Sequence, residues 1–123
     1  MLTRAAEGSR REARTDGASL ALAIEGGGLR GVVSAGMCVL LEKTGLIDSV
    51  DAIFGASSGA LNGSFTATGQ AALGSTNYLD TATLKFANPL RVLAGRVPID
   101  FDLLFDEVIR NRKPYDFEAL SDA

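Results

Sequence analysis

The fold is decided by the stretch Leu20-Ala21-Leu22-Ala23-Ile24-Glu25-Gly26-Gly27-Gly28-Leu29-Arg30-Gly31, in which a short apolar run leads into a glycine-rich loop. A continuous apolar run of this length is typical of a strand that is buried on both faces of a parallel sheet. From Gly31 to Lys43 the apolar residues recur at helical spacing, and Gly45 then stands at the position of a C-terminal cap. The stretch therefore predicts a strand, a loop and a helix in that order.

The same order follows once more along the chain. Val50–Phe54 is predicted as a second strand that runs into Gly55, and residues 58–68 are predicted as a helix that Gly69 ends. Strand, helix, strand and helix in sequence predict a parallel sheet with helical crossovers. Beyond this point the pattern indicates a short helix over residues 102–110. Two clear strands do not complete such a sheet, so we expect the fold to be incomplete in this chain.

Length and composition limit the class of protein. The 123 residues suggest one domain or part of one. Residues 1–18 are polar and without periodicity, which predicts a flexible tail ahead of a domain over residues 19–123. The net charge of −3 argues against nucleic acid as a partner, and no apolar run approaches the ~18 residues of a transmembrane segment.

Several residue types have a structural explanation. Cys38 is the only cysteine, so no intrachain disulfide can form, and it is predicted to be buried in its helix together with Met37. An acidic cluster near residues 100–107 is explained by a helix dipole, so no metal site is predicted. The chain contains no histidine, although most serine hydrolases use an imidazole base.

The glycine-rich loop is suited to holding negative charge. Successive glycines let backbone N–H groups converge on one small volume, and the following helix adds the positive end of its dipole. Such a loop can bind a phosphate or the oxyanion that forms when an ester carbonyl is attacked. Gly26, Gly28 and Gly31 also satisfy the dinucleotide fingerprint G-x-G-x-x-G, so a dinucleotide- or phosphate-binding module is an alternative. The second strand ends at Phe54-Gly55, without the acidic residue that would hold a ribose.

The second motif, G-x-S-x-G, is Gly55-Ala56-Ser57-Ser58-Gly59 and stands between the second strand and its helix. A serine in a sharp strand-to-helix turn holds its hydroxyl away from the sheet, and small neighbours leave room for the turn. Ser57 is therefore the candidate nucleophile, and the backbone N–H of Ser58 is a candidate oxyanion donor. Since both loops follow the carboxyl ends of strands, they share one crevice if the strands are neighbours.

Together the two motifs resemble those of the patatin-like phospholipase family, with a likeness that runs from Leu20 to Leu61 and more weakly to Leu120. The resemblance implies a three-layer α/β/α sandwich around a parallel central sheet. It also implies a lipid acyl hydrolase that releases fatty acids from phospholipids or neutral lipids, without a metal or an organic cofactor. Such a protein is expected in the cytoplasm or peripherally at membranes, with a lipid or membrane surface as its substrate.

The resemblance also assigns roles to residues. It implies that Ser57 attacks the ester and that Arg30 takes the family's basic position beside an oxyanion hole shaped by Gly26, Gly27, Gly28 and Gly31. Arg30 either steers an anionic head group or pairs with Glu25 or another acid. Glu25 itself stands where the family commonly has aspartate.

The resemblance further implies a Ser–Asp dyad, but its aspartate is not found among these residues. Family members carry its aspartate in an Asp-Gly-Gly or Asp-Gly-Ala motif after the serine, and they need no histidine. The only such motif here begins at Asp16, ahead of the first strand, and is interpreted as coincidence. The aspartate is therefore expected beyond residue 123, and an inactive, truncated relative that binds lipid is a further alternative.

Overall fold

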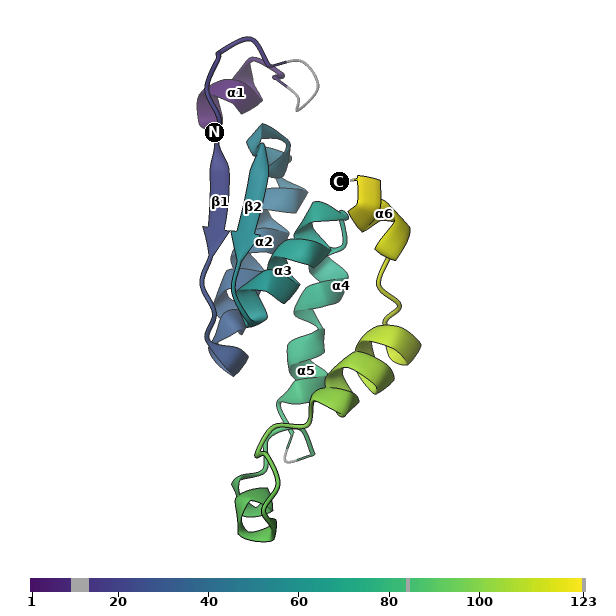
Figure 1. Ribbon diagram of the computed structural model, residues 1–123. Helices are drawn as coiled ribbons and strands as arrows, with labels where there is room; N and C mark the ends of the chain where they lie inside the picture. Colours follow the sequence, from purple (N-terminus) through teal and green to yellow (C-terminus); the bar gives the residue numbers. More distant parts are fainter. Residues whose placement is uncertain (10–13, 84, 123) are drawn as a thin grey trace.

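A computed structural model describes residues 1–9, 14–83 and 85–122 (Figure 1). At its centre β1 (Ala21–Ile24) pairs in parallel with β2 (Ala52–Gly55). The register places Leu22 beside Ile53 and Ile24 beside Gly55. The prediction of two neighbouring parallel strands is therefore confirmed.

Helical elements make up most of the remaining described chain. They are α1 (Leu2–Ala6), η2 (Gly28–Gly31), α2 (Val32–Lys43), η3 (Leu46–Ser49), α3 (Ser58–Ala67), α4 (Ala71–Ser75), α5 (Asn77–Thr81), η4 (Pro89–Ala94), η5 (Leu103–Arg112) and α6 (Phe117–Asp122). The two predicted helices that follow the strands correspond to α2 and α3. Gly45 and Gly69, which were expected to end them, have φ angles of 70° and 69°. The helix expected at 102–110 is η5, which is wound as a π-helix.

Helices pack against one face of the sheet (Figure 1). This face carries Leu22, Ile24 and Ile53, which form a core with Cys38 of α2 and Ala71 of α4. The Cys38 side chain is only 2% exposed, as the sequence predicts. One layer of helices on one layer of sheet is thus the α/β arrangement of the described chain.

The opposite face of the sheet carries Ala21, Ala23 and Phe54, which are all exposed. The expectation that residues 20–24 are buried on both faces is therefore wrong for the described chain. Side chains alternate along a strand, and the outward positions of β1 are alanines, which a run of apolar letters does not distinguish from core residues. Met37 of α2 is likewise 61% exposed instead of buried.

A second core joins α3 to the later helical elements. Its buried members are Phe65, Phe86, Leu104, Ile109 and Tyr115. The rings of Phe65 and Tyr115 meet edge to face with centroids 4.9 Å apart. This core fixes the part of the chain after residue 86 beside α3.

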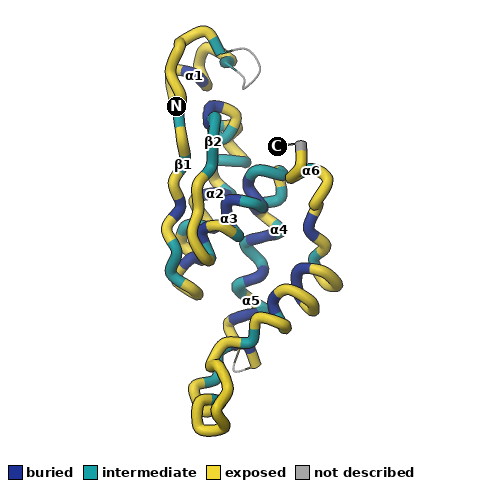
Figure 2. The backbone as a smooth tube through the Cα atoms, in the orientation of Figure 1, coloured by how far each residue is buried: buried dark blue, intermediate teal, exposed yellow. Residues whose placement is uncertain are grey.

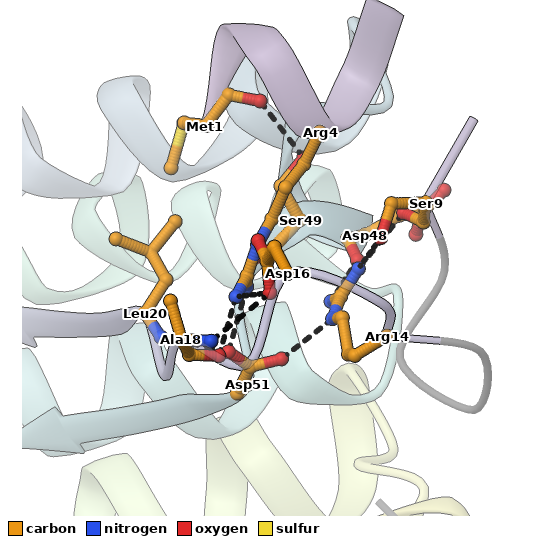
Figure 3. Close-up of polar contacts among 10 residues, drawn as sticks. All are labelled: Met1, Arg4, Ser9, Arg14, Asp16, Ala18, Leu20, Asp48, Ser49 and Asp51. Carbon is orange, nitrogen blue, oxygen red and sulfur yellow. Dashed lines mark hydrogen bonds and ion pairs between the residues drawn. The ribbon is translucent and has the colours of Figure 1, made fainter. Parts of the chain in front are cut away.

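The described part of residues 1–18 is docked at the amino ends of the strands (Figure 3). Arg4 is only 5% exposed and pairs with the carboxylates of Asp16, at 2.5 Å, and Asp51, at 2.7 Å. Its guanidinium also donates to the carbonyl oxygens of Ser49 and Ala18. The polar composition of this segment predicts a flexible tail. Its described part is docked instead, because Arg4 pairs with acidic side chains next to β2. The division of the chain after residue 18 stays a prediction, and residues 10–13 of the expected tail lie outside the described residues.

Asp51 is the centre of this cluster. Its carboxylate accepts hydrogen bonds from Arg4, from the backbone N–H of Leu20 and from Arg14. These bonds, the one from Arg4 foremost, hold the pKa of Asp51 well below its ordinary value.

None of the described helices has the length and hydropathy that crossing a membrane requires.

Candidate active site

Ser57 occupies the turn between β2 and α3 with φ 52° and ψ −123°. In the described chain it is the only residue other than glycine that has a positive φ. Such a conformation costs about 1–3 kcal/mol and persists only where the surrounding structure imposes it. The turn thus has the strained strand-to-helix geometry that a G-x-S-x-G motif predicts.

The two glycines of this motif allow α3 to begin close to both strands. A Cβ atom on Gly55 would overlap the backbone of Gly59, and one on Gly59 would overlap the carbonyl oxygens of Ile24 and Glu25. Both glycines are therefore required by close packing, since neither has a positive φ. The backbone N–H of Ala56 also donates to Ile24 O at 3.3 Å, which ties the turn to β1.

The glycine-rich loop lies directly against the Ser57 turn. A Cβ atom on Gly26 would lie 2.9 Å from the carbonyl oxygen of Ala56 and 3.2 Å from the Cβ of Ser57. Gly28 has φ +58° and open space around it, so here glycine provides backbone freedom beside an empty volume. The two motifs therefore meet in one crevice at the carboxyl ends of β1 and β2.

Three backbone donors at this crevice have no partner in the part of the chain that the structure describes. The N–H groups of Gly27, Gly28 and Ser58 donate to no residue that the structure describes. They stand at or next to the N-terminal ends of η2 and α3, where helix dipoles favour negative charge. The crevice thus has the donors that an anion or an oxyanion needs.

Arg30 lies over this loop. A Cβ atom on Gly27 would be 3.6 Å from the Arg30 Cβ and 3.7 Å from its Nε, so the side chain folds back across Gly27. Arg30 is exposed and forms no ion pair with any described residue, which includes Glu25. Its charge is therefore available to an anionic group at the crevice.

A buried polar network joins the loop to α3 and α5. The Nδ2 of Asn62 donates to the carbonyl oxygen of Gly31 at 2.9 Å and to Ser34 Oγ at 3.0 Å. Ser34 Oγ donates to the same carbonyl oxygen at 2.9 Å, and Tyr78 Oη donates to Asn62 Oδ1 at 3.0 Å. Burial raises the pKa of Tyr78, so its phenol stays a hydrogen-bond donor at neutral pH. The network fixes the point where the loop enters α2.

Gly31 and Ser58 pack against the same network. A Cβ atom on Gly31 would overlap Tyr78 Oη and would lie 2.7 Å from Ser58 Oγ, so glycine is needed here for space. Ser58 Oγ is buried and has no hydrogen-bond partner among the described residues. The group of Ser58 that is available at the crevice is its backbone N–H, at the first position of α3.

No described carboxylate serves Ser57 as a base. The Ser57 side chain is exposed and forms no hydrogen bond with a described residue. Asp16, which begins the Asp-Gly-Ala motif, pairs with Arg4 at the other end of the sheet and does not reach Ser57. Asp100 pairs with Arg91 at 2.7 Å, and the side chain of Asp116 accepts from a backbone N–H of α6.

Among the described residues, no group of three or more His, Cys, Asp or Glu could hold a metal ion.

An apolar cavity of about 460 Å³ opens beside Ser57. Such a volume lies within the roughly 300–1,000 Å³ of small-molecule sites. Its lining consists of Gly27, Gly28, Leu29, Arg30, Ser57, Ser58, Leu61, Asn77, Tyr78, Thr81, Phe86, Ala87, Ile99, Phe101, Leu104 and Phe105. Among these, Asn77 is 2% exposed and both polar atoms of its amide lack a partner in the described chain. The cavity is therefore apolar with a few polar groups near the crevice.

Sequence reasoning placed the two motifs and missed the residues that support them. Asn62 follows Ser58 by one helical turn, so a polar residue on the same face of α3 was a usable signal. Tyr78, Asn77 and the apolar wall after residue 86 come from the part of the chain in which no clear periodicity remains. Their place beside Ser57 follows from tertiary packing.

The family model for patatin-like phospholipases matches residues 22–122, which includes both motifs and the lining of the cavity. No curated protein and no solved structure matches the chain.

Proposed function

Since the chain belongs to the patatin-like phospholipase family, we propose that it is a serine-dependent lipid acyl hydrolase whose nucleophile is Ser57. One observation carries this proposal. Ser57 is held in a strained turn directly against a glycine-rich loop in which the N–H groups of Gly27 and Gly28 have no partner among the described residues. A strained, exposed serine beside unpaired donors is the arrangement that attack on an ester carbonyl needs.

The proposed reaction begins when Ser57 Oγ attacks the carbonyl carbon of an ester. Negative charge then develops on the carbonyl oxygen, and the N–H groups of Gly27, Gly28 and Ser58 are the proposed donors to it. The alcohol leaves with a proton, and water releases the fatty acid from the acyl-serine. The network of Asn62 and Tyr78 supports this geometry because it anchors the carbonyl of Gly31, where the loop ends.

The cavity beside Ser57 supports a substrate with an apolar acyl chain. Its wall is formed largely by aliphatic and aromatic side chains, among them Leu61, Phe86 and Leu104. Burial of an alkyl chain in such a wall gains about 0.8 kcal/mol per methylene. Arg30 at the rim is suited to the phosphate of a phospholipid head group.

We further propose that the general base is an aspartate beyond residue 123, as the resemblance implies. The complete domain would then be a three-layer sandwich, in which further elements cover the sheet face that carries Ala23 and Phe54. A protein of this kind is expected to act in the cytoplasm, peripherally at membranes.

Hydrolysis of a short activated ester by the full-length protein tests the assignment of Ser57. Ser57→Ala should abolish the reaction. Ser58→Ala is the matched control, because it removes a buried side-chain hydroxyl and keeps the backbone N–H. Activity that survives Ser57→Ala, or an equal loss in both variants, would show that Ser57 is not the nucleophile.

A further inference from the structure

Residues 86–100 form a closed loop, which we call the lobe, at the end of the molecule away from α1 (Figure 1). Its base is closed by backbone bonds from Asn88 N to Pro98 O, at 2.9 Å, and from Asp100 N to Phe86 O, at 2.8 Å. An ion pair between Arg91 and Asp100, at 2.7 Å, closes it further. The shape of the lobe is thus set by polar contacts at its base.

The far end of the lobe exposes large apolar side chains. Leu90, Val92, Leu93 and Val97 are between 58% and 86% exposed, and we call them the apolar tip. Figure 2 shows this part of the chain almost entirely as exposed. Single exposed apolar side chains are ordinary, but several on one projecting loop mark a surface that binds something.

The charge around the apolar tip is positive. Residues 81–99 include Lys85, Arg91 and Arg96 and contain no aspartate or glutamate, although the whole chain has a net charge of −3. Arg91 is neutralised by Asp100, whereas Lys85 and Arg96 are exposed and form no ion pair with a described residue. The lobe therefore complements a surface that is both apolar and anionic.

The lobe continues directly into the cavity at Ser57. Ile99, Phe101 and Phe105 line that cavity and are also 36%, 54% and 53% exposed. The rings of Phe101 and Phe105 stack with centroids 6.4 Å apart. Apolar side chains thus continue along the chain from the apolar tip to the mouth of the cavity, with Asp100 and Asp102 between them.

We propose that the apolar tip inserts into the surface of an anionic phospholipid bilayer and holds the cavity mouth against it. Aliphatic side chains enter the acyl region while Lys85 and Arg96 lie at the level of the phosphates, as in other interfacial segments. That the docked lipid is then hydrolysed rests on the function proposed for Ser57.

The test is sedimentation of the full-length protein with vesicles, in a Ser57→Ala background so that the lipid is not consumed. The vesicles contain phosphatidylcholine alone or mixed with phosphatidylglycerol. Leu93→Asp should weaken binding to mixed vesicles roughly tenfold or more, because it removes an inserted side chain. Arg96→Gln should weaken it roughly fivefold on mixed vesicles and leave neutral vesicles unchanged.

Leu40→Asp is the matched control, since Leu40 is a leucine that is 61% exposed on α2, outside the lobe. Circular dichroism melting checks that each variant is folded. Absence of vesicle binding, or an equal loss in Leu93→Asp and Leu40→Asp, would overturn the proposal. So would a change of oligomeric state in Leu93→Asp with vesicle binding unchanged, because the tip would then be a contact between copies.

Hydrolysis of a soluble short ester separates this inference from the proposed function. Leu93→Asp should keep that activity, with Ser57 intact, while it loses hydrolysis of vesicle lipid. If vesicles are not bound but Ser57 still hydrolyses the soluble ester, only the docking surface is wrong. If vesicles are bound but Ser57→Ala leaves ester hydrolysis unchanged, only the proposed nucleophile is wrong.

Discussion

The network around Asn62 gives the sharpest energetic prediction. Asn62 is 4% exposed and forms three side-chain hydrogen bonds, to Gly31 O, Ser34 Oγ and Tyr78 Oη. Asn62→Ala removes all three, so the Tyr78 hydroxyl loses its acceptor Asn62 Oδ1, whereas Gly31 O keeps its bond from Ser34. A buried polar group without a partner costs about 1–3 kcal/mol, and each lost bond about 0.5–1.5 kcal/mol. We expect Asn62→Ala to lower the free energy of unfolding by about 2–4 kcal/mol.

The pairing with Tyr78 can be measured by a double-mutant cycle. Tyr78→Phe alone leaves Asn62 Oδ1 unpaired and should cost about 1–3 kcal/mol. In the double variant neither orphaned group remains, so its cost should be about 1–2 kcal/mol less than the sum of the single variants. Urea unfolding followed by circular dichroism measures all four free energies.

The control for this cycle is Thr83→Ala, which removes an exposed hydroxyl bonded to the Asp80 carbonyl oxygen and should change stability by less than about 0.5 kcal/mol. Additivity of Asn62→Ala and Tyr78→Phe within about 0.3–0.5 kcal/mol would refute the network. Because the network anchors the glycine-rich loop, Asn62→Ala in the full-length protein should also lower kcat for a soluble ester while KM stays close to its original value.

Three further outcomes follow from the structure. Gly28→Ala in the full-length protein should lower kcat by about 10²–10³ with little change in KM, because it disturbs a proposed oxyanion donor. Gly27→Ala is the control, since the added Cβ meets only ordinary contacts and most activity should remain. A raised KM with a normal kcat in Gly28→Ala would indicate phosphate binding instead. Because the pKa of Asp51 is lowered in the folded protein, its stabilising effect is complete above the ordinary pKa of 3.8 and is lost as the pH falls through the lower folded value. As the pH is lowered through this range, the free energy of unfolding should therefore fall less in Asp51→Asn than in the unaltered protein. Residues 1–123 alone should not turn over a short activated ester, and sustained turnover that depends on Ser57 would show that a base exists among them.

The sequence predicted the parts of the fold that local chemistry determines. The two strands, helices α2 and α3 and the turn at Ser57 follow from apolar runs, helical spacing and the positions of glycines. The glycines of the two motifs are needed for different reasons, which the sequence alone does not distinguish. Gly28 needs its positive φ, whereas Gly31 and Gly59 need space for neighbouring atoms.

The features that sequence reasoning missed depend on partners far along the chain. The sequence predicts that Arg4 belongs to a flexible tail, because nothing local shows that Asp51 would bury it. The apolar run predicts that Ala23 is buried, although its side chain lies on the exposed face of the sheet. The cavity beside Ser57 likewise needs residues such as Phe86, whose place is set by the second core.

The proposed function requires that Ser57 is an activated nucleophile beside backbone donors that can receive an oxyanion. Labelling of the full-length protein with a fluorophosphonate, followed by peptide mass spectrometry, tests it most directly. We expect a single modified serine, Ser57, with labelling abolished in Ser57→Ala and retained in Ser58→Ala. Modification of another serine would contradict the assignment of Ser57. So would a folded full-length protein, with Gly28 and Ser58 unchanged, that does not react with the probe.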